Sequence, residues 1–530
     1  MNMTIQHICI IGAGISGLVA AKTFIEEGYE VTVFEKQQRL GGVWEVSRTY
    51  VGLTTQNPKD TYAFSDYPMP ASYPEWPTAE QMRNYLESYA QNFGLIEKIR
   101  FQAEVTQVKR RTGVKPGWVV SVNCRNHSND EIQKEEHEYD FVLVCNGLFN
   151  IPKIPLVPGK EEFIASGGQV LHSTEFNDNC QIEGKRVIVV GFGRSATDIT
   201  AYAVHLAKEC TLVFRESLWK VPKFFLGLVN IKYILLTRFS EAWLPYRQLQ
   251  GVEKVLHTFG KPIVWAFWKI NEILLRLQFR LDASGMLPDR PMSQSVNCSS
   301  AIAPENFYKY LYAGKIKTQK TTIARFCNDG VELANGKRLQ ADVVIFGTGF
   351  RQDVPFLEEK YRRLLIDDRG YLHLYRNLIH PDIPEIGFVG YNSSFFTQLT
   401  SEVGAWWLAE YVKGNLALPS RSETIEVMET ELHWRQTQWP QDRGNGGCVS
   451  PFNFHHLEQL IEDMGVKSHQ KGWQRIAEVM MPVNPSTYQK IRQELRGKRL
   501  SSVNDSENGD SLETDVTQEL LNQQMSIGKS

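Results

Sequence analysis

Residues 8–17 read ICIIGAGISG, a short apolar strand that runs directly into a GxGxxG turn. Gly12 permits the tight turn from strand to helix, Gly14 lets a pyrophosphate approach the backbone, and Gly17 lets the helix pack close to the strand. The free N–H groups and the dipole at the start of that helix favour the negative charge of phosphate groups. The stretch therefore predicts a βαβ unit of the Rossmann type that binds a dinucleotide.

A second stretch of the same kind lies further along the chain. Residues 187–196 read VIVVGFGRSA, again an apolar strand followed by a glycine-rich turn, here of the form GxGxxA. One such turn alone is weak evidence, because ordinary glycine-rich turns also match the pattern. Two of them, each after its own apolar strand, predict two dinucleotide-binding units on one polypeptide.

The residue that ends the next strand differs in charge between the two units. Residues 31–34 read VTVF and lead to Glu35, whereas residues 210–214 read CTLVF and lead to Arg215. A carboxylate at this position accepts hydrogen bonds from a free ribose diol, and a cation pairs with a ribose 2′-phosphate. We therefore predict FAD in the first unit and NADPH in the second. The alternative for Arg215 is a solvated charge at the end of a strand.

The composition indicates an ordinary globular protein of two or three domains, since the chain has 530 residues. A net charge of −2 and a charged fraction of 22% give no sign of a nucleic-acid partner. Eight cysteines without a CxxC pair predict no disulfide framework, no metal site and no redox dithiol, which favours a reducing, cytoplasmic setting. We expect no signal peptide and no transmembrane helix.

The similarity of two buried strands predicts how the units are connected. Residues 341–350 resemble residues 140–147, so we expect the chain to return to the first unit after the second one. We expect a capped helix at Thr78 and Gln81, a hairpin over residues 101–122 and a long polar turn over residues 123–138. The resulting domains are an FAD-binding domain at residues 1–165 and 331–500, an NADPH-binding domain at residues 166–330, and a disordered tail at residues 501–530.

An aromatic-rich segment at residues 217–300 interrupts the second unit. Residues 263–268 read IVWAFW, and apolar residues continue at helical spacing through Leu277. A helical subdomain that packs over the nucleotide-binding units accounts for this pattern. An apolar substrate channel or a peripheral membrane contact is the alternative.

Taken in order, the motifs resemble those of the flavin-containing monooxygenases, the class B group that holds FAD and NADPH on one polypeptide. Residues 39–44 read RLGGVW and match the family's second flavin motif. Residues 168–172, with Phe176, resemble the family signature FxGxxxHxxx(Y/F). Residues 191–198 resemble the NADPH fingerprint GxGxSxxD, and residues 346–350 are similar to the (F/L)ATGY motif.

The chain departs from the family pattern at three places. Ser166 replaces the leading phenylalanine of the signature, with Phe163 nearby, and Gly347 replaces the alanine of ATG. Many family members place an asparagine three residues before a motif lysine, beside the reactive carbon of the flavin. Here that position is Gln56, followed by Asn57. Either amide is a candidate for supporting the oxygenated flavin.

The resemblance implies an α/β fold with two Rossmann-like domains for FAD and NADPH, the second inserted in the first, and a helical insertion. It implies an NADPH- and O2-dependent monooxygenase with activity of the N,N-dimethylaniline monooxygenase kind. NADPH reduces the flavin, and a C4a-hydroperoxyflavin passes one oxygen atom to a nitrogen or sulfur of a small molecule. The alternatives are a Baeyer–Villiger-type monooxygenase and a non-oxygenating NADPH-binding flavoprotein, such as a sensor or an oxidase. A homodimer is left open.

The resemblance also assigns the site residues. The catalytic candidates are Gln56 and Asn57, and the signature residues are Gly168 and His172, of which His172 is expected to act as a hydrogen-bonding and conformational element rather than a general base. The candidates for cofactor binding are Gly12, Gly14, Ser16, Gly17, Glu35, Lys36, Arg39, Gly42, Val43, Trp44, Gln56, Asn57, Val105, Gly191, Gly193, Arg194, Ser195, Ala196, Arg215, Thr348 and Gly349.

Overall fold

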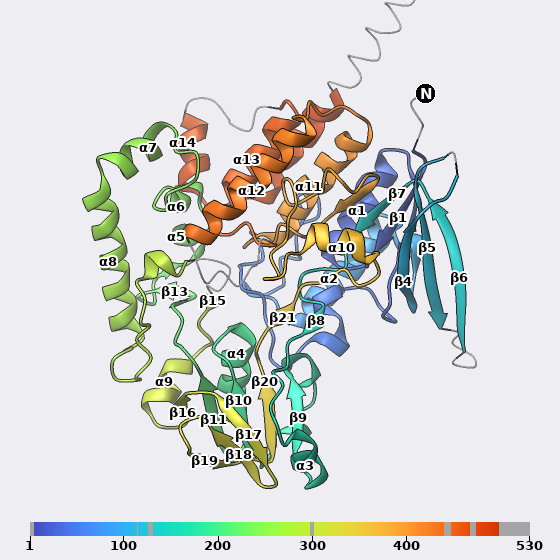
Figure 1. Ribbon diagram of the computed structural model, residues 1–530. Coiled ribbons are helices and arrows are strands. Elements are labelled where there is room, and N and C mark those ends of the chain that lie inside the picture. The colour runs from blue at the N-terminus through green and yellow to red at the C-terminus, as the bar shows by residue number, and fades with distance from the viewer. Residues whose placement is uncertain are drawn as a thin grey trace, which may run out of the picture.

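Two parallel five-stranded sheets form the centres of two stacked units (Figure 1). The structure is a computed structural model and describes residues 5–113, 115–125, 131–296, 301–438, 447–466 and 473–497. The expected tail at residues 501–530 lies outside the described residues. The prediction of two Rossmann-like units on one chain is confirmed.

The first sheet has the strand order β22-β7-β1-β2-β3. Helix α1 follows β1 directly, so the first glycine turn lies at the carboxyl edge of the central strand. The bounds are β1 (His7–Ile11), α1 (Ile15–Glu26), β2 (Glu30–Phe34), β3 (Ile99–Arg100), β7 (Phe141–Val144) and β22 (Ile386–Phe388).

The second sheet has the order β16-β11-β10-β20-β9, and helix α4 follows β10 at the second glycine turn. Its strands β9 and β20 flank the nucleotide-binding strand β10 on one side. The bounds are β9 (Gln169–His172), β10 (Arg186–Val190), α4 (Arg194–Ala203), β11 (Glu209–Phe214), β16 (Lys317–Lys320) and β20 (Val343–Phe346).

The expected return of the chain to the first unit at residues 341–350 is wrong. Strand β20 pairs with β10, where Val343 lies opposite Val187, and with β9, where it lies opposite Gln169. The chain leaves the second sheet only after β20, through the antiparallel pair of β21 (Phe350–Arg351) with β8 (Ile151–Pro152). All central parallel strands are buried on both faces and read alike, so their composition does not tell which sheet they join.

The long turn expected at residues 123–138 is also wrong. Among the described residues of this range, residues 123–125 end β5 and residues 132–138 belong to β6, in a three-stranded antiparallel sheet beside the first unit. The strand β6 is a solvent-exposed edge whose charged side chains conceal its strand character in the sequence. The bounds are β4 (Ala103–Arg110), β5 (Trp118–Arg125) and β6 (Ile132–Tyr139).

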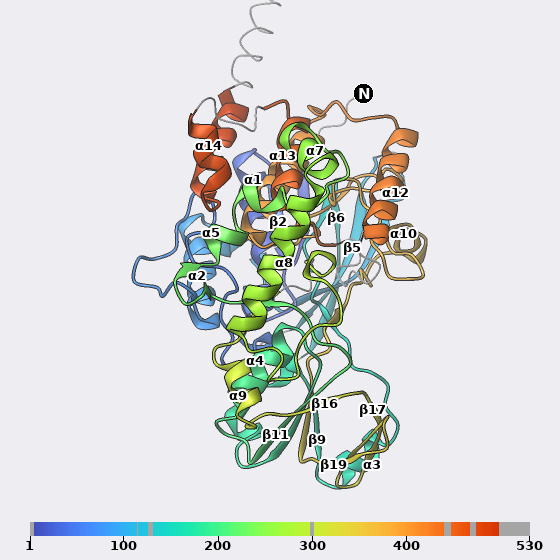
Figure 2. The same ribbon diagram turned by 90° about the vertical axis from the view of Figure 1, so that its left-hand side faces the viewer.

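The segment at residues 217–300 contains the expected helices in its described part. Its longest helix, α8, runs along the outer side of the molecule (Figure 2), and only Leu275 on it is buried. The bounds are β12 (Lys220–Val221), β13 (Phe224–Phe225), β14 (Val229–Asn230), α5 (Lys232–Leu235), α6 (Arg238–Glu241), α7 (Gly251–Thr258) and α8 (Lys261–Gln278), and β15 (Ala301–Ile302) follows the segment.

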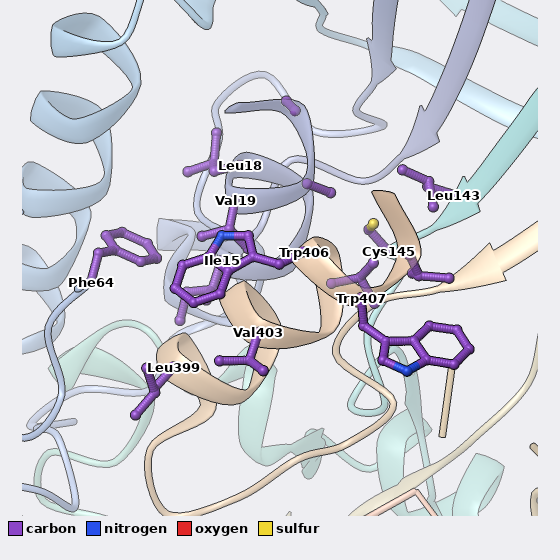
Figure 3. Close-up of a cluster of buried hydrophobic side chains, with 14 of the residues drawn as sticks. Ile15, Leu18, Val19, Phe64, Leu143, Cys145, Leu399, Val403, Trp406 and Trp407 are labelled. Atoms are coloured by element: carbon purple, nitrogen blue, oxygen red, sulfur yellow. The ribbon is translucent and has the colours of Figure 1, made fainter. Parts of the chain in front are cut away.

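The core of the first unit joins its nucleotide helix to a helix from the far end of the chain. Side chains of α1, such as Leu18 and Val19, pack against Val403 and Trp406 of α11 (Figure 3). The remaining bounds are α2 (Ala79–Asn92), α3 (Lys160–Ala165), α9 (Phe307–Tyr312), β17 (Ile323–Cys327), β18 (Gly330–Leu333), β19 (Arg338–Gln340), α10 (Glu359–Leu365), α11 (Thr397–Val412), α12 (Arg421–Gln438), α13 (Asn453–Asp463) and α14 (Trp473–Met480).

The structure also tests the predicted helix cap and the predictions from the cysteines. Thr78 and Gln81 form the predicted capping box at the start of α2. Cys448 is disulfide-bonded, which the cysteine spacing did not predict. Within the described residues, none of the helices combines the length and apolarity that crossing a bilayer requires.

Candidate functional site

The first glycine turn is pressed against the RLGGVW segment. A Cβ atom on Gly42 would lie 3.0 Å from Cα of Gly14, and one on Gly14 would lie 3.3 Å from Cα of Gly42, so a side chain at either position would press on the other backbone segment. The N–H of Gly41 donates to the carbonyl of Ala13 at 3.0 Å. Gly14 is the N-cap of α1 and makes no side-chain cap, so the amides of the first helical turn lie beside two backbone segments that meet without side chains. This arrangement fits a pyrophosphate.

Glu35 is fixed at the end of β2, next to this turn. Its carboxylate is buried and accepts hydrogen bonds from the N–H groups of Ala13 at 2.7 Å and Gln37 at 2.9 Å. A carboxylate has about four acceptor positions, so two bonds leave capacity for a ribose diol. The position and the free capacity fit the plain adenosine end of FAD.

The other candidates of the first unit differ in exposure. Ser16 shares a hydrogen bond of 3.1 Å with Ser401 of α11. The side chain of Trp44 is buried, whereas those of Lys36, Arg39 and Val43 are exposed, and Val105 is buried in β4. Their contacts with FAD stay predictions.

Arg194 lies at the second glycine turn, as the first residue of α4. Its Nε donates to Asp198 one helical turn later, and its Nη2 lies 3.4 Å from Oγ1 of Thr54 in the first unit. Tyr50, also of the first unit, donates to the same Asp198 at 2.7 Å. The Nη1 of Arg194 is buried and has no hydrogen-bond partner among the described residues. An unpaired cationic donor beside the amides of Gly193 and α4 fits an anionic phosphate group.

Arg215 follows β11 and is exposed. Strand β11 pairs in parallel with β10, so Arg215 lies at the same edge of the sheet as the turn of Gly191. Within the described part of the chain, no ion pair or hydrogen bond holds its side chain. A free cation at this position fits a ribose 2′-phosphate.

His172 is fully buried and bridges two motifs. The N–H of Thr174 donates to its Nδ1 at 3.3 Å, so Nδ1 is an acceptor and Nε2 carries the proton that is donated to the carbonyl of Gly349 at 3.1 Å. Burial lowers the pKa of His172, which favours this neutral form. The neighbouring Thr348 donates to the carbonyl of Lys153, at the crossing between the units. This geometry suits the expected positioning role of His172.

Gly168 explains the departure at the start of the signature. A Cβ atom at Gly168 would lie 2.4 Å from the ring of Phe163, which is fully buried. The aromatic ring therefore comes from α3 of this chain and occupies the space over Gly168, although Ser166 stands at the signature's own position.

Gln56 and Asn57 differ in burial and in hydrogen bonding. The Nδ2 of Asn57 donates to the carbonyl of Phe395, and Asn57 is buried. Gln56 is exposed, and its side chain makes no hydrogen bond within the described residues. Both residues line a small cavity with a volume of about 10 Å³, about the space of one water molecule. The other lining residues are apolar and come largely from the helical insertion and its flanks: Val221, Ile231, Leu235, Leu236, Ala301, Ile302 and Phe395.

Three polar residues meet at this junction. Asp198 closes the GxGxSxxD pattern, and Tyr50 belongs to a stretch, residues 50–53, that the family places beside the flavin. Lys220 carries no signal in the sequence, since a lysine after a tryptophan is ordinary. Only the fold brings them to the second glycine turn.

Comparison with protein families gives a match over nearly the whole chain. Residues 5–468 match the model of the flavin-binding monooxygenase-like family. A probable flavin-containing monooxygenase 1 of Arabidopsis thaliana is 30% identical over 511 residues, which cover 89% of this chain and 94% of the relative. A dimethylaniline monooxygenase [N-oxide-forming] 2 of Oryctolagus cuniculus is 28% identical and covers 78% of this chain and 75% of its own length.

Solved structures share the fold. The S-allyl-L-cysteine S-oxygenase from Allium sativum superposes with a TM-score of 0.59 at 20% identity, covering 94% of both chains. The OTEMO complex with FAD and NADP superposes with a TM-score of 0.65 at 17% identity, covering 87% of this chain and 98% of the other. These similarities support the α/β arrangement of two dinucleotide-binding units.

Proposed function

Because the chain belongs to the flavin-binding monooxygenase-like family, we propose that this flavin-dependent monooxygenase uses NADPH and O2 to transfer one oxygen atom to a nitrogen or sulfur of a small molecule. A relative that forms N-oxides and a structural neighbour that oxygenates sulfur both support this class of acceptor. The observation that carries the proposal is the cavity lined by Gln56, whose side chain makes no hydrogen bond among the described residues, and by apolar side chains.

Each unit holds one cofactor in this proposal. Gly14, Gly42 and Glu35 would hold the pyrophosphate and ribose of FAD, and Gly193, Arg194 and Arg215 would hold the phosphates of NADPH. The chemistry that the flavin supplies when bound is acceptance of a hydride and activation of O2. The protein's own task is to orient the two cofactors and to exclude water.

Gln56 is the amide that acts toward the reacting oxygen in our proposal. Its N–H groups are free to donate, whereas Asn57 is committed to the carbonyl of Phe395 and holds the loop in shape. The apolar wall from Val221, Ile231 and Leu235 would limit the access of water from the side of the cavity. Shape and access then select the substrate.

The test measures products and NADPH consumption together. Purified, flavin-loaded protein is incubated with NADPH, O2 and a panel of tertiary amines, thioethers and cyclic ketones. We expect N-oxides or S-oxides with less than one peroxide released per NADPH. Lactones or esters from the ketones alone would support the Baeyer–Villiger alternative, and NADPH oxidation that yields only peroxide would support the oxidase alternative.

We also propose a peripheral membrane contact at the face of α7 and α8. The apolar side chains on this face are exposed, and Lys254 and Lys261 stand among them, a pattern that suits an anionic lipid surface. Co-sedimentation with phosphatidylglycerol vesicles should be lost on Ile270→Asp with Ile273→Asp; binding that the double variant leaves unchanged would overturn the proposal. The exposed apolar residues are Val252, Val255, Phe259, Ile263, Ile270, Ile273 and Leu277.

A cytoplasmic setting and a homodimer stay predictions.

A further inference from the structure

Lys220 is a lysine buried in the nucleotide-binding unit. It lies on β12, shortly after Arg215, and only 2% of its surface is exposed. Lysine is almost never buried this deeply unless a carboxylate pairs with it. Among the described residues, no hydrogen bond or ion pair involves its amino group.

The amino group lies against the second glycine turn. Its Nζ is 5.5 Å from the centre of the ring of Phe192, the residue between Gly191 and Gly193. The ring of Phe192 in turn contacts Phe214 at the end of β11, with ring centres 4.9 Å apart. Lys220 therefore lies beside the turn and strand end at which a dinucleotide binds.

The charges around Lys220 are unbalanced. The carboxylate that faces it is Asp198, which already binds Arg194 and the hydroxyl of Tyr50. Arg194 repels the amino group. Lys223 is a further cation beside the same pair, and the carboxylates of Glu305 and Glu75 act on Lys223. Burial, with repulsion from Arg194, outweighs the attraction of Asp198 and lowers the pKa of Lys220 to about 7.

We propose that Lys220 takes up a proton from solvent when the phosphates of the nicotinamide dinucleotide bind, and that the resulting ammonium group then holds the cofactor. Phosphate groups at the turn would supply an anionic partner for the amino group, and a nearby opposite charge favours the charged form of an amine. Nη1 of Arg194, buried without a hydrogen-bond partner among the described residues, is a second donor that suits an anion at this turn. The inference rests on the proposed NADPH site and adds proton coupling to it.

The test is calorimetric and needs no turnover. Binding of NADP⁺ to the flavin-loaded protein is measured at pH 8 in two buffers of different ionisation enthalpy, which gives the number of protons taken up. We expect close to one proton for the unmodified protein. The affinity for NADP⁺ should also fall by up to about tenfold per pH unit as the pH rises above 7. Binding then requires protonation of an amine that is neutral in the free protein.

The variant Lys220→Met tests the amino group without disturbing the packing around it. Methionine fills a similar space without the buried amine, so the variant should melt no lower than the unmodified protein. Proton uptake should vanish, and affinity for NADP⁺ at pH 7.5 should fall about tenfold or more. The matched control is Lys208→Met, an exposed lysine of the same unit, which should keep both values.

The outcomes separate this inference from the proposed function. Binding of NADP⁺ without proton uptake in the unmodified protein, or uptake that Lys220→Met leaves unchanged, would overturn the role of Lys220 alone. A flavin-loaded protein that binds no NADP⁺ would overturn the NADPH site itself. Should Lys220→Met fail to fold, the pH dependence of NADP⁺ affinity in the unmodified protein decides, since a flat profile contradicts the inference.

Discussion

Ala196 and Gly347 share one small space between helix α4 and strand β20. A Cβ atom on Gly347 would lie 2.6 Å from the Cβ of Ala196 and 2.8 Å from its backbone nitrogen. The alanine at the third position of the second glycine turn and the glycine in place of the ATG alanine are therefore a matched pair. The departure from the family motif is a consequence of packing within this chain.

Gly347→Ala should therefore destabilise the protein, by about 1–3 kcal/mol for an overpacked buried site. Adding Ala196→Gly should recover only part of the loss. It removes the Cβ contact at 2.6 Å but leaves the backbone atoms of residue 196 at 2.8 Å. Denaturant unfolding of the flavin-loaded variants measures both. A double variant as unstable as Gly347→Ala would show that the Cβ atom of Ala196 contributes nothing to the loss.

Gln56 and Asn57 should respond differently to substitution. Gln56→Ala should leave stability unchanged, since the side chain is exposed and unbonded, but should raise the peroxide released per NADPH. Asn57→Ala should cost about 1–3 kcal/mol of stability, because it leaves the buried carbonyl of Phe395 without its donor. Peroxide yield and melting curves separate the two effects, and Gln56→Asn is the conservative control. Reversed effects would assign the active amide to Asn57.

Arg215→Ala should weaken the preference for NADPH over NADH. Loss of a charge-assisted bond to the 2′-phosphate predicts a decrease of about 10- to 100-fold in kcat/KM for NADPH, with little change for NADH. Lys208→Ala removes an exposed cation before the same strand and serves as the matched control. An unmodified protein that uses both nucleotides equally would remove the basis for this assignment.

His455 links the helical insertion to α13. Its two ring nitrogens lie 2.8 Å from Glu241 and 3.0 Å from Glu253. Burial lowers the pKa of His455, but the two carboxylates outweigh it and raise the pKa to about 9, from 6.5. The protonated form of His455 thus stabilises the folded protein by about 3 kcal/mol. This stabilisation is complete below pH 6.5 and is lost as the pH rises through 9.

Melting temperatures measured from pH 6 to pH 10 test this link. The unmodified protein should lose stability across the interval, and His455→Gln should show a flatter profile. His257→Gln is the matched control, because His257 of α7 bonds to a carbonyl, that of Ala242, at 2.9 Å. Parallel profiles for the unmodified protein and His455→Gln would contradict the assignment.

The sequence predicts those parts of the fold that depend on local chemistry. Glycine spacing after an apolar strand identifies both nucleotide turns, because the turn itself requires these residues. The capping box at Thr78 is equally local. Motif order then identifies the family without any knowledge of the tertiary contacts.

Features that depend on contacts between distant residues could not be predicted from the sequence. The sheet to which β20 belongs depends on pairing with β9 and β10, and a buried strand carries the same apolar residues in either sheet. Strand β6 is polar because it is an edge, so composition assigns it to a turn. Lys220 becomes notable only when the fold buries it against Phe192.

Labelled oxygen shows directly whether the protein transfers an oxygen atom from O2 to a substrate. The flavin-loaded protein is given NADPH, ¹⁸O₂ and the best amine or thioether from the panel, and the product is analysed by mass spectrometry. We predict one ¹⁸O atom in each product molecule, with at least one NADPH consumed for each. Consumption of NADPH with all of the label in hydrogen peroxide, and none in any organic product, would contradict the account.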